Sequence, residues 1–364
     1  MQTPRRILAA ALVVVLSLGL LAFASASERE AQKAAGTAAA AKRAKGKVIT
    51  RNLDVPWGLD FLPNGQALVT QRSRATISKI ARRGGRARKV MSVPGVDRNA
   101  GEGGLLGLAV APNYRKSKFV YAYLTTSSDN RIVRFKLGRP GTTKVILKGL
   151  ERSSIHNGGR IAFGPDGKLY AGVGDAGNTS LAQNKSSRNG KILRLNPNGS
   201  TPKSNPFGKG SKVWTYGHRN VQGFAWDKQG RMWASELGQD SFDEVNLIRK
   251  GNNYGWPRVE GRGNTQNGRY TNPKVIWRTS EASPSGAAIK GRKLYVGALR
   301  GERLWTVPLR GNDTKKPVAR FVGRYGRIRT VERAPDGSLW FTTSNEGGND
   351  IIVRLAGKKR RGGN

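Results

Sequence analysis

One hairpin pattern recurs six times along this chain and limits its fold more than any other feature. Each copy has an apolar residue, a turn rich in Pro, Asp, Asn or Gly, and then an alternating strand segment. A tight turn followed by a two-residue alternation is typical of a β-hairpin. The copies occupy residues 61–70, 110–124, 163–174, 226–236, 288–299 and 334–344.

The spacing of these repeats indicates the architecture. The turns follow one another at intervals of roughly 45–62 residues, which suits units of several short strands. No long segment beyond the N-terminus has the 3.6-residue period of an amphipathic helix. We therefore predict an all-β fold, a six-bladed β-propeller, because closing the ring hides most strand edges. The alternative is a two-domain β-sandwich protein.

The N-terminus has the pattern of an export signal. Two arginines at 5–6 precede an uncharged apolar run over 7–23, and an A-x-A cleavage pattern ends at Ala26. A retained membrane anchor is the alternative, whereas cleavage leaves no stable membrane span. We expect a secreted, periplasmic or cell-envelope protein. The predicted segments are a signal peptide (1–26), an Ala/Lys-rich linker (27–47), the propeller (48–356) and a basic tail (357–364).

Positive charge dominates the composition. The chain has 65 Lys and Arg against 23 Asp and Glu, a formal net charge of +42. This charge favours acidic partners, and acidic cell-envelope polymers are the ones we expect. Nucleic acid is not expected, because the basic residues are spread along the chain and not gathered in one motif. The sequence has no cysteine and two histidines, which excludes a disulfide scaffold and argues against a zinc or iron–sulfur site.

Polar residues just before the repeats are the candidate site residues, because a propeller carries its function on the loops at one mouth. His156 stands in the segment Ser-Ile-His-Asn-Gly-Gly-Arg before the third repeat. Histidine is the natural general base near neutral pH, and flanking glycines allow a ligand to approach closely. The alternative is a structural histidine that is bonded to backbone groups.

Arginines precede two further repeats. Arg219 and Asn220 stand before the fourth repeat, and Arg327 and Arg329 stand before the sixth. In a strand, Arg327 and Arg329 point to the same face, where two guanidinium groups repel each other unless an anion lies between them. We predict a propeller mouth that binds a polyanionic small molecule, with His156 as its acid/base partner. For Arg219, an ordinary surface position in a basic protein is the alternative.

One loop gathers several acidic residues within this basic chain. Residues 236–244, which include Asp243 and Glu244, follow the fourth repeat. Carboxylate and carbonyl oxygens of this kind suit calcium. The spacing is not that of an EF-hand, and a solvated acidic turn is the alternative.

Together these segments resemble the soluble pyrroloquinoline-quinone (PQQ)-dependent aldose sugar dehydrogenases of the glucose/sorbosone dehydrogenase family. The resemblance covers residues 52–355, and its specificity comes from the number and order of the motifs. That family's fold is a six-bladed propeller. The matching segments are LDVPWGLDFLPNG, GEGGLLGLAVAPNY, HNGGRIAFGPDGKLYAGVGD, NGKILRLNPNG, SNPF, YGHRNVQGFAW, DEVNLIRKGNNYGWP and GRIRTVERAPDGSLW.

The resemblance implies a quinoprotein oxidoreductase that converts the C1 hydroxyl of an aldose to a lactone by hydride transfer to PQQ. His156 matches the family's general base, and Asp175 matches a carboxylate that orients it. The electron acceptor is not specified. Residues that match cofactor-binding positions are Glu102, Arg219, Asn220, Arg300, Arg327 and Arg329.

The resemblance also implies calcium. Gly238 and Gln239 fall where backbone carbonyls bind the calcium that polarises the quinone. Glu244 and Tyr254 match a second, structural calcium site, and Asp243 of the acidic loop is a further candidate ligand.

Several positions depart from the family's pattern. Glu102 replaces the usual glutamine and repels the cofactor unless calcium or an arginine neutralises it. Arg300 replaces a lysine, and Leu237 replaces the usual His or Gln before the calcium loop. A non-catalytic propeller that binds sugars or acidic envelope polymers is therefore the alternative function. A metal-dependent hydrolase or lactonase needs more inward acidic and histidine ligands than this sequence offers.

Overall fold

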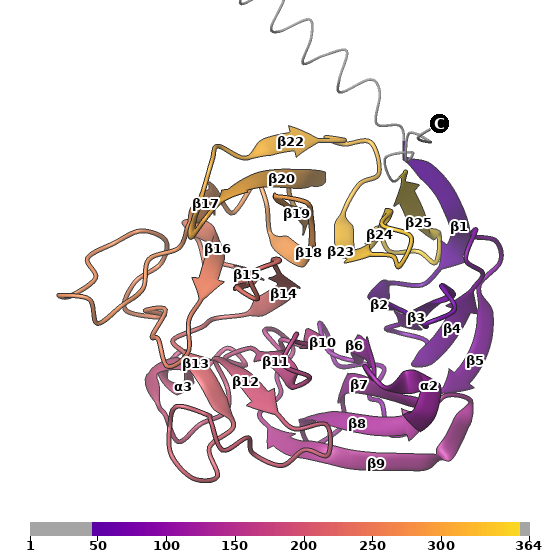
Figure 1. Ribbon diagram of the computed structural model, residues 1–364, viewed down its shortest axis with the longest axis horizontal. Helices are drawn as coiled ribbons and strands as arrows, with labels where there is room; N and C mark the ends of the chain where they lie inside the picture. Colours follow the sequence, from indigo (N-terminus) through magenta and orange to yellow (C-terminus); the bar gives the residue numbers. More distant parts are fainter. Residues whose placement is uncertain (1–45, 357–364) are drawn as a thin grey trace, which may run out of the picture. The chain divides into compact units, whose positions relative to one another are not determined.

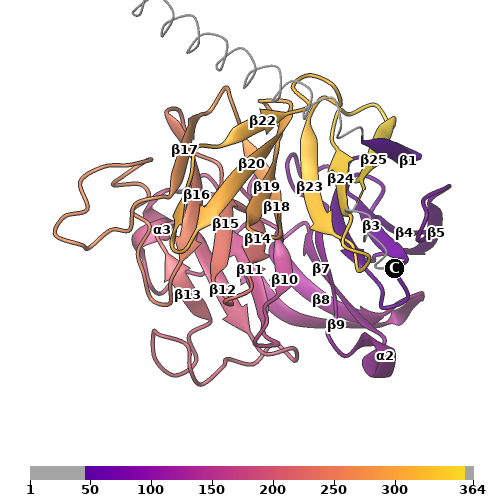
Figure 2. The ribbon, with the colours of Figure 1, turned by 45° about the horizontal axis from the view of Figure 1, so that its top comes forward.

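Six antiparallel sheets stand as blades around a common centre (Figures 1 and 2). This computed structural model describes residues 46–356, so the predicted signal peptide, nearly all of the linker and the basic tail lie outside the described residues. The prediction of an all-β, six-bladed propeller is confirmed. No helix in the described part of the chain is long and apolar enough to cross a membrane.

In each blade the chain passes from an innermost strand outward, and each strand pairs with the one before it. The exceptions are β22, which pairs with β20, and β1, which precedes its blade in the sequence. The first blade is β2 (Pro56–Phe61), β3 (Ala67–Gln71), β4 (Thr76–Ile80) and β5 (Arg88–Ser92). The second is β6 (Leu105–Val110), β7 (Phe119–Thr125), β8 (Asn130–Lys136) and β9 (Arg139–Leu150). The third is β10 (Ile161–Phe163), β11 (Leu169–Val173), β12 (Lys191–Leu195) and β13 (Val213–Tyr216). The fourth is β14 (Val221–Trp226), β15 (Met232–Glu236), β16 (Phe242–Ile248) and β17 (Val275–Arg278). The fifth is β18 (Pro284–Lys290), β19 (Lys293–Ala298), β20 (Arg303–Arg310), β21 (Asp313–Thr314) and β22 (Val318–Arg320).

The last blade joins the two ends of the described chain. It is built from β23 (Ile328–Arg333), β24 (Leu339–Thr343), β25 (Asp350–Leu355) and β1 (Lys47–Leu53). The N-terminal strand β1 pairs with β25 and so completes the outer edge of this blade. This pairing closes the ring with backbone hydrogen bonds, in a chain that has no cysteine. β1 begins at Lys47, the last residue of the predicted linker.

The repeated turns connect the first and second strands of the blades. In the third blade, for example, the Gly167 N–H donates to the Gly164 carbonyl at 3.0 Å, and Gly167 has a φ of +69° that suits glycine. The second blade differs, because the short helix α2 (Tyr114–Ser117) stands in place of a tight turn. A second short helix, α3 (Ser180–Gln183), lies between β11 and β12.

The inner strands pack so closely that some positions admit only glycine. A Cβ on Gly107 in β6 would lie 2.1 Å from the Gly159 carbonyl oxygen of the next blade. A Cβ on Gly286 in β18 would lie 2.7 Å from the Cα of Thr330 in β23. Apolar side chains fill the spaces between blades, and the largest fully buried ones include Trp57, Trp233 and Trp340. This close packing holds the loops before the inner strands in fixed positions.

Candidate active site

A cavity of about 670 Å³ opens at the end of the central channel where the inner strands begin. We call this end the site mouth. Its wall takes residues from all six blades, so segments far apart in the sequence meet there. Five of the predicted site residues line it, namely Glu102, Asn220, Arg300, Arg327 and Arg329.

The cavity is strongly cationic. Burial, together with the neighbouring guanidinium groups of Arg72 and Arg327, lowers the pKa of Arg329 to about 9. The Nε of Arg329 is buried and has no hydrogen-bond partner among the described residues. Arg327 donates its Nε to the Ser344 carbonyl at 3.1 Å. An anion in the cavity would relieve the repulsion between these arginines and satisfy the unpaired donor.

A histidine–carboxylate pair lies beside the cavity. The Nδ1 of His156 is 2.7 Å from Oδ1 of the fully buried Asp175. Asp175 also accepts hydrogen bonds from the Gly177 N–H and, through Oδ2, from the Trp256 indole at 2.9 Å. Burial alone would raise the pKa of Asp175, but these three donors outweigh it and hold the pKa below its ordinary value. An ionised Asp175 favours the tautomer that carries its proton on Nδ1, which leaves Nε2 as the candidate proton acceptor.

The backbone of His156 is tied to the cavity wall. Its N–H donates to Oε2 of Glu102 at 3.0 Å, and its φ of +52° is in the left-handed region. The next glycine, Gly158, donates its N–H to Oδ1 of Asn220 at 3.1 Å. Two residues predicted to bind a cofactor, Glu102 and Asn220, therefore also position the loop that carries the candidate base.

Arg219 lies behind the cavity and not on its wall. Its Nε and Nη2 donate to Oε1 of Gln239 at 2.9 and 2.6 Å, and its guanidinium lies 5.7 Å from the ring centre of Trp256. Burial lowers the pKa of Arg219. In this structure Arg219 binds the loop expected to hold calcium, and the cavity's open donors come from other arginines.

The expected calcium loop wraps around a carboxylate from a later segment. Four successive backbone N–H groups, those of residues 239–242, donate to Oε1 of Glu260 at 2.7–3.1 Å. Asp243 accepts from the N–H groups of Gly238 and Ser283, and burial raises its pKa to about 6. The carboxylates of Asp243 and Glu260 thus hold the loop's backbone, and Asp243 and the loop's carbonyl oxygens stay candidate calcium ligands.

The second expected calcium position has a buried oxygen atom that accepts no hydrogen bond from the described residues. Burial and the nearby carboxylate of Glu236 raise the pKa of Glu244 to about 8. Oδ1 of Asn246 is buried and accepts no hydrogen bond within the described structure, while its Nδ2 donates to Glu244 at 2.9 Å. The Tyr254 hydroxyl donates to the Leu247 carbonyl at 2.8 Å and accepts from the Arg249 N–H at 2.8 Å. The oxygens of Glu244 and Asn246 are of the kind that suits a cation, and the role predicted for Tyr254 stays a prediction.

Comparison with known proteins identifies the family. Residues 53–354 match glucose/sorbosone dehydrogenase. The chain belongs to the glucose/sorbosone dehydrogenase family. A PQQ-bound aldose sugar dehydrogenase from Streptomyces coelicolor has 46% sequence identity and a TM-score of 0.81, covering 86% of this chain and 98% of that chain.

Two relatives that match this chain are also named as sugar dehydrogenases. Quinoprotein glucose dehydrogenase B of Acinetobacter calcoaceticus is 34% identical over 71% of this chain, and the match spans 62% of that relative, less than two thirds. Aldose sugar dehydrogenase YliI of Escherichia coli (strain K12) is 28% identical over 84% of this chain and 92% of that protein. The resemblance stated from the sequence motifs is confirmed.

The sequence did not reveal the residues that support the His156–Asp175 pair. Trp256 binds Asp175, and Gln183 of α3 donates to the Trp256 carbonyl at 2.7 Å. Behind them, the ammonium of the fully buried Lys191 donates to three backbone carbonyls, and burial lowers its pKa to about 7. Those carbonyls belong to Leu181, Ala182 and Asn189. The motif Asn-Tyr-Gly-Trp-Pro marks Trp256 in the sequence, but no local signal shows what it contacts.

The floor of the cavity was missed as well. Trp57 and Arg72 line the cavity, and Arg160 stacks on Trp57 with its guanidinium 4.4 Å from the ring centre. Arg160 also donates to the Gln222 carbonyl at 2.7 Å and to the Thr330 hydroxyl at 3.0 Å. Arg160 lines a second cavity and not this one, so Trp57 and the guanidinium stacked on it lie between the two cavities.

Proposed function

We propose that this chain is an exported quinoprotein sugar dehydrogenase that oxidises the C1 hydroxyl of aldoses to lactones with PQQ and calcium. The observation that carries the proposal is a cationic cavity that lies beside a His156–Asp175 pair at one mouth of the propeller. The relatives named as sugar dehydrogenases, one of them PQQ-bound, support the reaction class.

The residues of the cavity fit PQQ. This quinone carries three carboxylates, and the cavity wall carries four arginines, Arg72, Arg300, Arg327 and Arg329, against the carboxylates of Glu102 and Glu346. The unpaired Nε of Arg329 is a donor that a ligand carboxylate would satisfy. The volume of about 670 Å³ lies in the usual range for small-molecule sites. When bound, the quinone supplies the hydride acceptor.

His156 acts as the general base. Its Nε2 takes the proton from the anomeric hydroxyl, which prepares C1 to release a hydride. Asp175 holds the ring through Nδ1 and stabilises the positive charge that the ring gains. Trp256 fixes the second oxygen of Asp175, so that the carboxylate cannot turn away from the ring.

Two arginines of the cavity wall would stabilise negative charge. Arg327 and Arg329 would offer fixed donors to quinone oxygens that gain negative charge when the bound group is reduced. Glu102 is held against the His156 backbone and faces this arginine-rich wall, which offsets its own repulsion of an anionic cofactor.

Calcium would be held at two positions by backbone carbonyl, side-chain amide and carboxylate oxygens. No group of three or more His, Cys, Asp or Glu in residues 46–356 is placed to hold a metal. Carbonyls and amides must therefore contribute, and we assign the Gly238 and Gln239 carbonyls to one cation. We assign the Glu244 carboxylate and Oδ1 of Asn246 to the other.

Reconstitution tests the proposal. Purified protein is incubated with PQQ and calcium, its absorption spectrum is recorded, and dye reduction is measured with several aldoses. We expect stoichiometric uptake of the quinone and aldose-dependent dye reduction. Sugar binding without quinone uptake would instead identify the non-catalytic propeller that Glu102 and Leu237 favour.

A further inference from the structure

A cationic groove lies away from the site mouth, between the outer strands of two neighbouring blades. It has a volume of about 700 Å³ and is lined by residues of β1 and β5, among others. These two strands are neighbours in the ribbon views of Figures 1 and 2. Five exposed cationic side chains line it, and its wall residues include no Asp, Glu or aromatic residue. The five are Arg51, Arg74, Arg86, Arg88 and Lys89.

Most of this positive charge is not neutralised within the protein. Arg74 forms an ion pair with Asp54 at 3.6 Å. Ion pairs at exposed positions such as this one contribute little binding energy. The other four cations of the groove form no ion pair within residues 46–356. The uncharged polar residues of the groove include Gln71 and Ser78, which bond to each other: the Gln71 amide donates to the Ser78 hydroxyl at 3.0 Å. The groove therefore offers a partner mainly positive charge.

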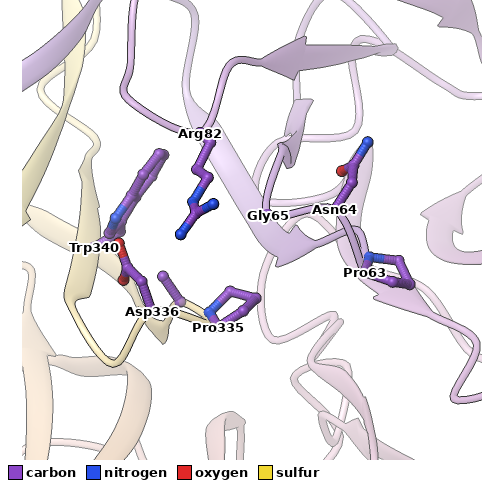
Figure 3. A pocket seen from close by; sticks show the side chains of 8 residues that line it. Pro63, Asn64, Gly65, Arg82, Pro335, Asp336 and Trp340 are labelled. Atoms are coloured by element: carbon purple, nitrogen blue, oxygen red, sulfur yellow. The ribbon is translucent and has the colours of Figure 1, made fainter.

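The loop that carries Arg86 is fixed at two points. The Gly85 N–H donates to the Ile49 carbonyl of β1 at 2.7 Å. On the other side, the side chain of Arg82 extends between Trp340 and the turn at residues 63–65, as Figure 3 shows. These contacts place the basic run of residues 86–89 against β1, so the groove exists before any partner binds.

We propose that this groove binds an acidic polysaccharide. Cations arranged along a groove suit a flexible polymer that carries one carboxylate on each sugar. Single-stranded nucleic acid is disfavoured, because proteins that bind it stack its bases on aromatic side chains, and this wall has none. The groove accounts for a small part of the net charge of +42. The proposal does not depend on dehydrogenase activity.

A pair of matched variants tests the groove. The groove variant is R86Q/R88Q/K89Q, and the control is R139Q/K144Q/K148Q on β9, which removes the same charge from exposed positions of the next blade. Binding of fluorescent polygalacturonate to the full chain is measured at low ionic strength. We expect the groove variant to bind about tenfold more weakly and the control less than twofold. Equal losses, or no loss in the groove variant, would overturn the proposal.

A measurement on the unmodified protein avoids any effect on folding. Acetylation of Lys89 and of Lys144, both exposed, is compared with and without polygalacturonate. We expect selective protection of Lys89, and equal protection of both lysines would contradict a localised site. Neutral dextran should give no protection. If single-stranded poly(dT) of equal charge binds the groove more tightly than polygalacturonate, the assignment to a polysaccharide is wrong.

Discussion

The two histidines of this chain occupy similar places but have different surroundings. Each lies in the loop before an inner strand and sets its Nδ1 against a buried carboxylate, His156 on Asp175 at 2.7 Å and His218 on Glu236 at 2.8 Å. His218 is fully buried, and its Nε2 is bonded to the Thr215 hydroxyl at 2.9 Å. The side chain of His156 is 11% exposed, and no described residue hydrogen-bonds to its Nε2.

This difference shows that a carboxylate beside a histidine does not by itself make a base. His218 stacks on Tyr254 with ring centres 4.7 Å apart, and Glu236 also accepts the Arg219 N–H. The His218 pair therefore holds together the loop that carries Arg219. The His156 pair leaves one nitrogen available to a substrate. A histidine–carboxylate pair is thus fully bonded within the protein before the fourth blade, whereas the pair before the third blade is the one that we propose for chemistry.

The largest effect is expected from His156→Asn. The variant retains a side chain that can bond to Asp175 but has no basic nitrogen, so the proton of the sugar hydroxyl has no acceptor. We expect turnover to fall by about 10²–10⁴-fold, with quinone uptake unchanged. Steady-state dye reduction and a quinone titration measure the two quantities. Turnover within a few-fold of the unmodified protein would remove His156 from the role of base.

A smaller loss of turnover is expected from Asp175→Asn. The amide can still bind the ring, but it cannot stabilise the charge that His156 gains, and it can favour the wrong tautomer. We expect turnover to fall by roughly 10²-fold while the affinity for quinone stays within a few-fold. If turnover is unaffected, Asp175 has only the structural role of holding Trp256 and the Gly177 N–H.

His218→Gln should separate stability from chemistry. This change removes a buried side chain that bonds to Thr215 and Glu236, and we expect a loss of about 2–4 kcal/mol of unfolding free energy. Turnover per folded molecule should stay within a few-fold, since both ring nitrogens of His218 are already bonded to Thr215 and Glu236. Urea unfolding and active-site titration provide the two readouts. A specific loss of turnover in the folded fraction would place His218 in the chemistry and end the contrast with His156.

The fold and most of the cavity wall could be predicted from the sequence because their signals are local. A Pro-Asp-Gly turn followed by alternation marks a hairpin wherever it occurs, and six copies indicate the ring. Residues just before the inner strands must then meet at one mouth, which is why Asn220, Arg327 and Arg329 line one cavity.

The remaining contacts depend on side chains that meet across long stretches of sequence. Arg219 binds Gln239, Glu260 accepts four N–H groups from the calcium loop, and Trp256 reaches Asp175 across 81 residues. The first contact lies at the loop between β15 and β16, and the other two depend on how the segment after β16 folds back onto earlier residues; neither segment belongs to the repeat. The sequence shows which of these residues are polar or aromatic, but it does not show which residues they contact.

The smallest effect, and a gain, is expected from Glu102→Gln. Glu102 lines the cavity and accepts the His156 N–H through Oε2. Glutamine keeps an oxygen for that bond and removes a negative charge that faces the carboxylates of the quinone. Affinity for PQQ should therefore rise by a few-fold, an effect that weakens with salt because like charges across an open cavity are screened.

Glu281→Gln, outside the cavity, is the matched control and should leave affinity unchanged. If affinity falls in the Glu102 variant alone, this carboxylate is needed where it stands, as a partner of a cation or of the surrounding arginines, and the histidine loop and the cofactor are coupled through it.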